Sequence, residues 1–407
     1  MTIEGILGRM RVGDLYPVRI MAVINLSSES FYRGSFVGPE DALSRAEALT
    51  EERADMLDIG AVSTAPKSPS ISVEEERRRL IPTLKIILDN LDISISVDTE
   101  RAIIAEEALS MGASSVNDVS GLLDPNMASV VADHDAEVVI MASRSRPGDL
   151  LTMKEIIGVL SLRLNKAVDA GVSADKIVLD PGVGRWVPEK MPEYDLAILD
   201  GLSRLRVLDR PVLVAVSRKS FIGSTLNRPD PADRLNGSLG ATAIAVYNGA
   251  HIVRTHDVSA SLDVIKMAEA IRGKPAFVEE GGVKVEVSSY IGSPSDLKEA
   301  FKRIQVGEGG SKAMSGKGAF RMLSLRGVTS KEALIIKQEM LARGGDAAIP
   351  MGALRCDSGP MEVLVIGTVA QLNGLINNLK GQPFNLPAIG EAIMDAIGQI
   401  DCTERYR

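Results

Sequence analysis

Short apolar runs alternate with longer amphipathic segments along the first two thirds of the chain. The runs are rich in β-branched residues, and eight of them can be counted, ending at Asn25, Gly60, Thr99, Gly121, Ser143, Gly182, Ser220 and Val258. Continuous apolar strands of this kind are typical of a parallel sheet that is covered on its faces. The segments between them have helical spacing: Ser72 and Glu75 form a capping box, and Leu80, Leu84 and Ile87 follow on one helix face.

Eight strand–helix units in succession predict a (β/α)8 TIM barrel, an α/β fold, over residues 1–273; a doubly wound open sheet is the alternative. After the barrel, a proline, paired glycines and charged residues predict a linker over residues 274–284. Mixed strand and helix signals then predict a smaller α+β domain over residues 285–407, to which the sequence assigns no role. A chain of 407 residues has room for both domains.

Composition and charge restrict the classes of partner. The formal net charge of −8 argues against a broad nucleic-acid or anionic membrane surface, because both need a basic face. No stretch is long and apolar enough to predict a membrane-spanning helix. Cys356 and Cys402 have no CxxC spacing, and three histidines do not suggest a multi-histidine metal site. We therefore expect a soluble, cytoplasmic protein with no nucleic-acid and no membrane partner.

Polar residues at the ends of the apolar runs are the candidate site. The carboxyl ends of the strands of a TIM barrel meet at one mouth, so these side chains are expected to line one pocket. They are Asn25, Asp58, Asp98, Asn117, Asp180, Lys219, Arg254 and His256. In the stretch VLVAVSRKSFIG, Arg218 and Lys219 directly follow a buried run. Either Lys219 reaches a ligand from a rigid strand end, or both cations only pair with neighbouring carboxylates.

Motifs along the barrel resemble, in their order, those of the dihydropteroate synthase family of pterin-binding barrels. They are INLSSESF, DIGAVSTAP, SVDT, NDVSG, DPGVG, SRKSFIG and RTHDV, and the last two are the most specific. The resemblance covers residues 1–273. It implies an enzyme that joins 6-hydroxymethyl-7,8-dihydropterin diphosphate to p-aminobenzoate and releases pyrophosphate. It also implies Mg2+ as the cofactor and a homodimer as the assembly.

The resemblance implies a role for each matching residue. The implied pterin-binding residues are Asp98, Asn117, Met141, Asp180 and Lys219. The implied diphosphate- and amine-binding residues are Asn25, Ser63, Thr64, Ser220, Arg254 and His256. Lys219, Arg254 and His256 are the implied catalytic residues, and Asn25 is the implied metal ligand. The chemistry agrees, because acids and amides complement the nitrogens of a pterin ring and cations stabilise a leaving diphosphate.

Three departures from the family pattern affect the expected amine site. Ala65 stands where the family usually has an arginine. Residues 140–148 (IMASRSRPG) lack the usual His-Met-x-Gly pattern, and Arg185 and Trp186 replace a more phenylalanine-rich loop. The first substrate is therefore better supported by the sequence than the second.

The wording of the first two motifs looks most like the archaeal branch of the family. Members of that branch are thought to serve methanopterin synthesis with a ribofuranosyl-aminobenzene 5′-phosphate as the amine. Lys67, Arg144, Arg146 or Arg185 would then bind the additional phosphate, for which a guanidinium is well shaped. The alternative is that these cations are solvated loop residues.

Two other functions stay open at this point. A corrinoid-linked pterin methyltransferase uses a similar barrel, but it expels no diphosphate, so the pair Arg254 and His256 argues against it. A non-catalytic pterin-binding protein is the other alternative, and Ala65 together with the altered residues 140–148 makes it credible. Release of pyrophosphate separates an enzyme from a binding protein.

Overall fold

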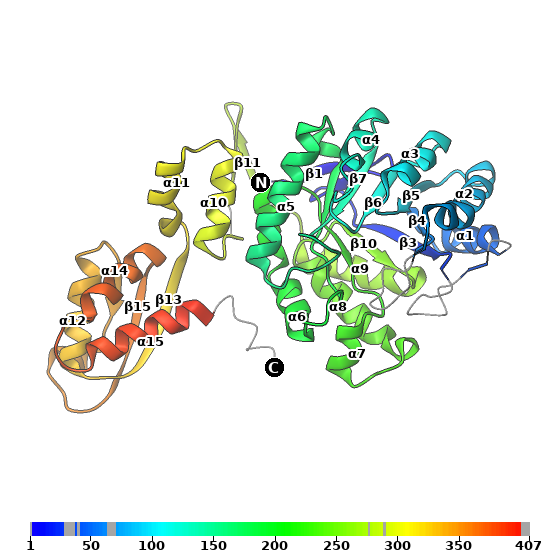
Figure 1. The fold of residues 1–407 in the computed structure, drawn as a ribbon. Helices are drawn as coiled ribbons and strands as arrows, with labels where there is room; N and C mark the ends of the chain where they lie inside the picture. Colours follow the sequence, from blue (N-terminus) through cyan, green and yellow to red (C-terminus); the bar gives the residue numbers. More distant parts are fainter. Residues whose placement is uncertain are drawn as a thin grey trace. The chain divides into compact units, whose positions relative to one another are not determined.

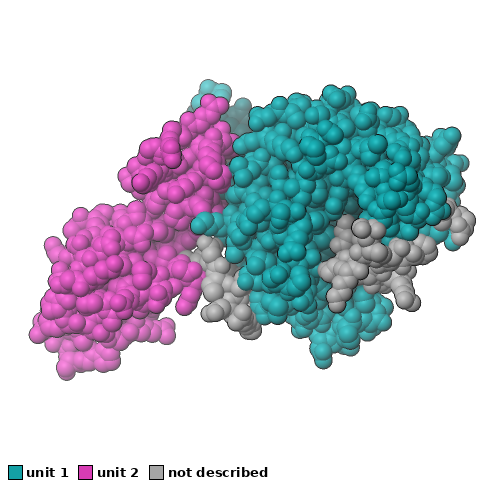
Figure 2. Space-filling model, viewed as in Figure 1, with its two compact units in different colours: residues 1–288, 406–407 teal, residues 289–405 magenta. Residues whose placement is uncertain are grey.

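The computed structural model describes residues 2–27, 37–38, 41–62, 71–275, 277–287 and 290–399. These residues belong to two compact units, which divide between Ser288 and Ser289 and are coloured separately in Figure 2. Unit 1 contains the predicted barrel, and unit 2 contains the C-terminal α+β region.

All eight predicted barrel strands are present and parallel, so the TIM barrel prediction is confirmed. They are β3 (Arg19–Asn25), β4 (Met56–Gly60), β5 (Ser94–Asp98), β6 (Ser115–Asp118), β7 (Glu137–Met141), β8 (Ile177–Asp180), β9 (Leu213–Ala215) and β10 (Ile252–Thr255). Their order in the sheet is β8-β7-β6-β5-β4-β3-β10-β9. A parallel bridge between Leu179 and Val212 joins the two outer strands, and the Leu179 backbone N–H donates to the Pro211 carbonyl at 2.9 Å. The sheet is therefore closed into a ring.

Helices cover the outside of this ring (Figure 1). They are α1 (Ala42–Glu51), α2 (Val73–Asn90), α3 (Ala102–Met111), α4 (Met127–Asp133), α5 (Met153–Asp169), α6 (Pro192–Asp200), α7 (Ser220–Leu226), α8 (Leu235–Tyr247) and α9 (Val258–Arg272). The predicted start of α2 is correct, since the Ser72 hydroxyl accepts a hydrogen bond from the Glu75 backbone N–H at 3.1 Å. Within the described residues, no helix combines the length and the apolar character needed to cross a membrane.

An N-terminal hairpin covers one end of the barrel. Strands β1 (Glu4–Leu7) and β2 (Met10–Gly13) pair antiparallel, and their Leu7 and Val12 side chains are buried. Both belong to one apolar cluster with barrel-strand residues such as Met56 and Ile252. This packing removes apolar surface from water at that end, which leaves the chemistry to the end where the strands have their carboxyl termini.

Most of the predicted linker, residues 274–284, lies in a second hairpin. Strand β11 (Phe277–Glu280) pairs antiparallel with β12 (Val283–Glu286). Gly281 and Gly282 form the turn between them, and both have positive φ angles, +58° and +77°. Paired glycines suit a two-residue hairpin turn because they adopt such φ angles without a steric cost. The same glycines that indicated a linker therefore make a tight turn.

Unit 2 is an α+β structure around a separate core. Its antiparallel sheet has the order β13-β15-β14, with β13 at Phe320–Val328, β14 at Asp346–Ala348 and β15 at Met361–Thr368. Its helices are α10 (Pro294–Arg303), α11 (Glu308–Met314), α12 (Ser330–Leu341), α13 (Met351–Leu354), α14 (Val369–Leu379) and α15 (Leu386–Gly398). Apolar residues of α12, β15 and α14, among them Ile336, Val365 and Leu372, are fully buried together.

Candidate active site

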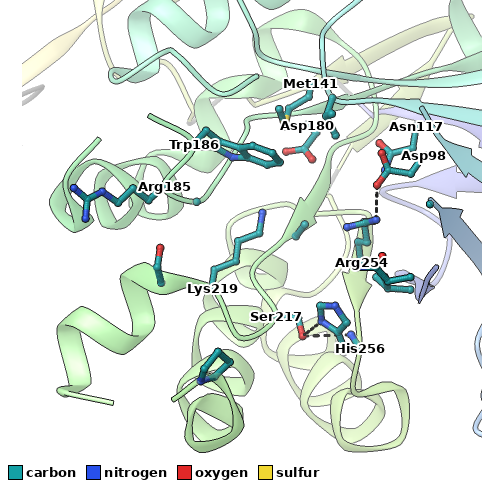
Figure 3. A pocket seen from close by; sticks show the side chains of 18 of the residues that line it. Asp98, Asn117, Met141, Asp180, Arg185, Trp186, Ser217, Lys219, Arg254 and His256 are labelled. Atoms are coloured by element: carbon teal, nitrogen blue, oxygen red, sulfur yellow. Dashed lines mark hydrogen bonds and ion pairs between the residues drawn. The ribbon is translucent and has the colours of Figure 1, made fainter. Parts of the chain in front are cut away.

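A cavity of about 580 Å³ opens among the carboxyl ends of the barrel strands, and Figure 3 shows side chains that line it. Its lining includes most of the residues implied by the sequence: Asn25, Asp98, Asn117, Met141, Asp180, Lys219, Ser220, Arg254 and His256. Ser63 and Thr64 lie outside the described residues, as do Ala65 and Lys67. Side chains that are far apart in the sequence are thus collected by the strand ends, as expected for this fold.

Arg254 on β10 connects two carboxylates at the base of the cavity. Its Nε donates to Asp58 Oδ2 at 2.6 Å, and one of its terminal amino groups donates to Asp98 Oδ2 at 2.7 Å. Asp58 is fully buried, and the same Oδ2 atom accepts a hydrogen bond from Asn117 Nδ2 at 3.1 Å. A buried carboxylate of this kind fixes the positions of its partners because its own side chain has no freedom to move. Asp58 was expected to line the pocket, but it is fully buried and is not among the lining residues, so it acts through Arg254 and Asn117.

The surroundings of Asp98 and Asn117 favour a ligand that donates hydrogen bonds. Burial raises the pKa of Asp98 to about 7, against the positive charge of Arg254, which lowers it. Within the described residues, the buried Oδ1 atom of Asn117 has no hydrogen-bond partner. An unpaired buried acceptor is costly unless a ligand supplies a donor. Both residues therefore present polar atoms that suit a ligand with N–H groups.

Asp180 and Lys219 form the other side of the cavity. Asp180 Oδ1 accepts a hydrogen bond from the Gly182 backbone N–H at 2.7 Å, and Lys219 Nζ donates to the Val183 carbonyl at 2.5 Å. Lys219 Nζ also lies 5.3 Å from the centre of the Trp186 ring. Burial lowers the pKa of Lys219 to about 8, and the Asp180 charge opposes that shift. Figure 3 shows both side chains directed into the cavity.

His256 is held by Ser217 at the edge of the cavity. The Ser217 hydroxyl lies 2.9 Å from His256 Nδ1 and also accepts a hydrogen bond from the His256 backbone N–H at 3.3 Å. The pKa of His256 is lowered to about 3. Burial is the largest cause, and the nearby positive charge of Arg254 is the second. The imidazole is therefore neutral at neutral pH, and it offers a hydrogen bond rather than a charge to a ligand.

Arg218 and Lys219 have different partners although they are consecutive. Arg218 has a φ angle of +55° and donates two hydrogen bonds to the Asp257 carboxylate, at 2.9 and 2.7 Å. It also donates to the Pro231 and Ala232 carbonyls. Arg218 therefore pairs with a neighbouring carboxylate, as one of the two alternatives predicted for both cations. Lys219 follows the other alternative, because it lies in the cavity.

Two cavity residues, Trp186 and Arg234, received no role from the sequence. The buried Arg234 guanidinium donates to the carbonyls of Arg218 at 3.0 Å and Arg228 at 2.9 Å, so that it fixes the backbone around α7. Trp186 lies in the loop after β8, beyond the strand end, and Arg234 ends a short 3-10 helix (Pro231–Arg234); no pattern of apolar positions points to either. Gly184 is a further special position: a Cβ atom there would lie 3.0 Å from Lys219 Cδ.

The arginines that could bind an additional phosphate, Arg144, Arg146 and Arg185, differ in their positions and partners. Arg185 lines the cavity but is exposed, and it donates to the Pro188 carbonyl at 3.1 Å. In Figure 3 its side chain points away from Asp180 and Lys219. Arg144 forms an ion pair with Glu155 at 3.2 Å, and Arg146 is exposed. Of these three arginines, only Arg185 is among the residues that line the cavity.

Comparison with known proteins places the barrel among characterised relatives. The model of the pterin binding enzyme family matches residues 21–256. The chain is 36% identical to the dihydropteroate synthase of Synechocystis over 261 residues, which is 62% of this chain and 89% of that protein. A Clostridium difficile dihydropteroate synthase, solved in the presence of pteroic acid, has a TM-score of 0.58 and 39% identity, covering 63% of this chain and 97% of that one.

A second solved structure leads to the same family. The Xanthomonas albilineans dihydropteroate synthase with 4-aminobenzoic acid has a TM-score of 0.59 and 32% identity. The match covers 68% of this chain and 100% of that one. The matched family model, the barrel and the cavity residues agree, and the chain belongs to the pterin binding enzyme family.

Proposed function

We propose that the barrel is a dihydropteroate synthase of folate biosynthesis. It joins 6-hydroxymethyl-7,8-dihydropterin diphosphate to an aromatic amine and releases pyrophosphate. The observation that carries this proposal is the convergence of Asp98, Asn117, Asp180 and Lys219 on one cavity with Arg254 at its base. Relatives named dihydropteroate synthase, at about the same length as the barrel, support it.

The pterin ring is bound by complementary polar groups. Its N3–H and 2-amino group form a donor edge that the Asp180 carboxylate can accept as two parallel hydrogen bonds. The unpaired Oδ1 atom of Asn117 accepts from another ring N–H, and the Lys219 ammonium donates to the ring carbonyl and N5. Burial raises the pKa of Asp180, and the positive charge of Lys219 opposes that rise.

The reaction exchanges one bond at the pterin methylene carbon. The bond from that carbon to the diphosphate oxygen breaks, and its electron pair leaves with pyrophosphate. The lone pair of the amine then forms the new carbon–nitrogen bond, and the amine nitrogen loses one proton to solvent. The protein contributes position and charge: Arg254 and Lys219 are cations facing the cavity where negative charge grows, and a fixed charge needs no reorganisation.

Mg2+ is the proposed cofactor, and the donor set fits it. Within the described residues, no group of three or more His, Cys, Asp or Glu side chains forms a metal cage. Mg2+ needs no such cage, because it keeps several waters and binds one or two protein oxygens together with substrate phosphates. Asn25 lines the cavity, and its Oδ1 atom accepts a hydrogen bond from the Ser27 backbone N–H at 2.9 Å, so the second lone pair of this oxygen would hold the ion. The bound ion would neutralise charge on the leaving diphosphate.

p-Aminobenzoate is the proposed amine. The Xanthomonas albilineans relative was solved with 4-aminobenzoic acid, and of the described cations considered for a phosphorylated amine only Arg185 lines the cavity. Arg185 is the cavity cation to test. Its replacement by alanine should weaken both amines little; a selective loss of the ribofuranosyl-aminobenzene phosphate would instead identify that compound as the substrate.

The deciding experiment measures pyrophosphate release from the pterin diphosphate with Mg2+ and p-aminobenzoate. We expect release by the wild-type protein and by Lys85→Ala, an exposed lysine on α2. We expect no release by Lys219→Ala or Arg254→Ala. Tight pterin binding without release by the wild type would contradict the proposal and favour a non-catalytic pterin-binding protein or a methyl-transfer component.

A homodimer is proposed for the assembly. Helix α8 packs against α9, and apolar side chains on the two helices are exposed: Ile244, Tyr247, Met267 and Ile271 are each more than half accessible to solvent. Apolar side chains gathered on neighbouring helices mark contact surfaces between proteins. The double variant Ile244→Glu, Met267→Glu should be monomeric by light scattering. Leu162→Glu on α5 is the control, because it charges an apolar site that is more exposed than either of these two.

A further inference from the structure

Lys190 and Asp195 form a buried ion pair behind the cavity. Lys190 Nζ lies 3.2 Å from Asp195 Oδ1, and the two side chains are 0% and 1% exposed. Lys190 precedes α6, and Asp195 lies within it. Neither residue lines the cavity, and neither has a role in the reaction described above. A buried ion pair usually adds little net stability, because removing two charges from water offsets their attraction.

The pair is bonded to the backbone of the loop that follows β8. Lys190 Nζ donates to the Gly182 carbonyl at 2.6 Å, and Asp195 Oδ1 accepts from the Gly184 backbone N–H at 2.8 Å. Both glycines have positive φ angles, +74° and +121°. Glycine has more backbone freedom than other residues, so a loop with two such positions needs external contacts to keep one shape. Lys190 and Asp195 supply those contacts at both glycines.

The loop held in this way makes two contributions to the cavity. The Gly182 backbone N–H orients Asp180, whose Oδ1 atom it contacts at 2.7 Å. The Val183 carbonyl, one residue later, accepts the hydrogen bond from Lys219 Nζ at 2.5 Å. The positions of the pterin-binding carboxylate and of the lysine ammonium therefore both depend on the path of residues 180–184.

We propose that Lys190 and Asp195 are positioning residues for pterin binding. They hold residues 180–184 so that Asp180 and Lys219 lie at the correct distance for the two sides of the ring. This inference rests on the proposed pterin substrate. This role also explains why two charged residues are buried here. Apolar residues could fill the same space, but only hydrogen-bonding groups can fix a backbone carbonyl and a backbone N–H at the same time.

Pterin binding can be followed by the fluorescence of Trp186. The chain contains one tryptophan, and it lies beside Lys219 in the cavity wall, so ligand binding should change its emission. The variants are Lys190→Met, which removes the cation at similar length, and Asp195→Asn, which keeps an acceptor for Gly184. The control is Arg206→Met. It breaks the Arg206–Asp14 pair, whose side chains are 17% and 4% exposed, without touching residues 180–184.

We expect Lys190→Met to raise the Kd of the pterin diphosphate roughly 10- to 100-fold, the scale of a lost hydrogen bond to a charged group. Asp195→Asn should raise it less, by about threefold to tenfold, because a neutral amide oxygen still accepts from the Gly184 N–H, though more weakly than a carboxylate, and the Lys190–Gly182 contact remains. The KM for p-aminobenzoate should stay unchanged in both variants. Arg206→Met should lower the Tm without changing the Kd of the pterin diphosphate.

A purely structural pair would behave differently. If Lys190→Met and Arg206→Met change pterin binding equally at matched loss of Tm, or if both substrates weaken together, the inference is wrong. If Lys190→Met does not fold, Asp195→Asn decides, and an unchanged Kd overturns the inference. A wild-type protein that binds no pterin would refute the proposed function itself, whereas normal wild-type binding with unaffected variants would refute only the positioning role.

Discussion

Arg218 and Lys219 are adjacent in the chain, yet one holds the barrel together and the other faces the substrate cavity. The positive φ angle of Arg218 turns its guanidinium to Asp257, while Lys219 Nζ reaches the Val183 carbonyl across the cavity. Two cations after a buried strand therefore have separate purposes, and substitution should separate them.

Replacing Lys219 by methionine should remove activity and leave the fold intact. The change deletes a buried ammonium group. Burial lowers the pKa of this group, which means that its charge is unfavourable in the folded protein, so the Tm should not fall. Arg218→Met should instead destabilise the protein by about 3 kcal/mol, because it leaves the Asp257 carboxylate without its partner. Thermal unfolding and pyrophosphate release would be measured for both variants. A large Tm loss in Lys219→Met would contradict this assignment.

The value of kcat/KM should fall as the pH rises through about 8. The folded-state pKa of Lys219 is lowered from 10.5 to about 8, so its ammonium is lost above that pH and can no longer donate to the ring. Because the folded state lowers this pKa, it binds the proton less tightly than the unfolded state does. Wild-type stability should therefore rise between about pH 8 and 10.5, where the unfolded state keeps the proton and the folded state does not. Lys219→Arg should lose the alkaline decrease; if the decrease persists, another group causes it.

Gly184→Ala should impair pterin binding beyond its effect on stability. The new Cβ atom would lie 3.0 Å from Lys219 Cδ and 3.4 Å from its Nζ, which displaces the side chain. The matched control is Gly249→Ala, at a φ angle of +107° with nothing within 4 Å of a Cβ atom. Both should cost about 1 kcal/mol or more of backbone strain, measured by chemical unfolding. Equal Kd values for the pterin diphosphate would count against a role of Gly184 in the approach of Lys219.

A shortened protein that ends at residue 288 should fold and release pyrophosphate. The described cavity residues lie between Val23 and His256, and unit 1 has its own core. Circular dichroism and the release assay would test this. A shortened protein that folds but releases no pyrophosphate would show that unit 2 takes part in the reaction.

Strand existence was readable from the sequence because every barrel strand is a short apolar run, and residues that follow such runs point to the mouth. The ends of the strands were harder to predict. The apolar run that ends at Ser220 contains β9, which has only three residues. Arg218, later in the same run, has a left-handed backbone conformation that no apolar pattern encodes. Lys190 and Asp195 carried no signal at all. Their burial depends on contacts with Gly182 and Gly184, which exist only in the folded loop.

The pairing of the first barrel strand with the last one determines when the site can exist. β3 pairs with β10, and the hydrogen bond from Arg254 to Asp58 joins residues 196 positions apart. Contacts so distant in the chain form late, because a large loop must close before they gain any energy. During refolding, helices should therefore regain their circular dichroism before the protein regains its capacity to bind pterin, and a nascent chain should stay inactive until β10 has left the ribosome.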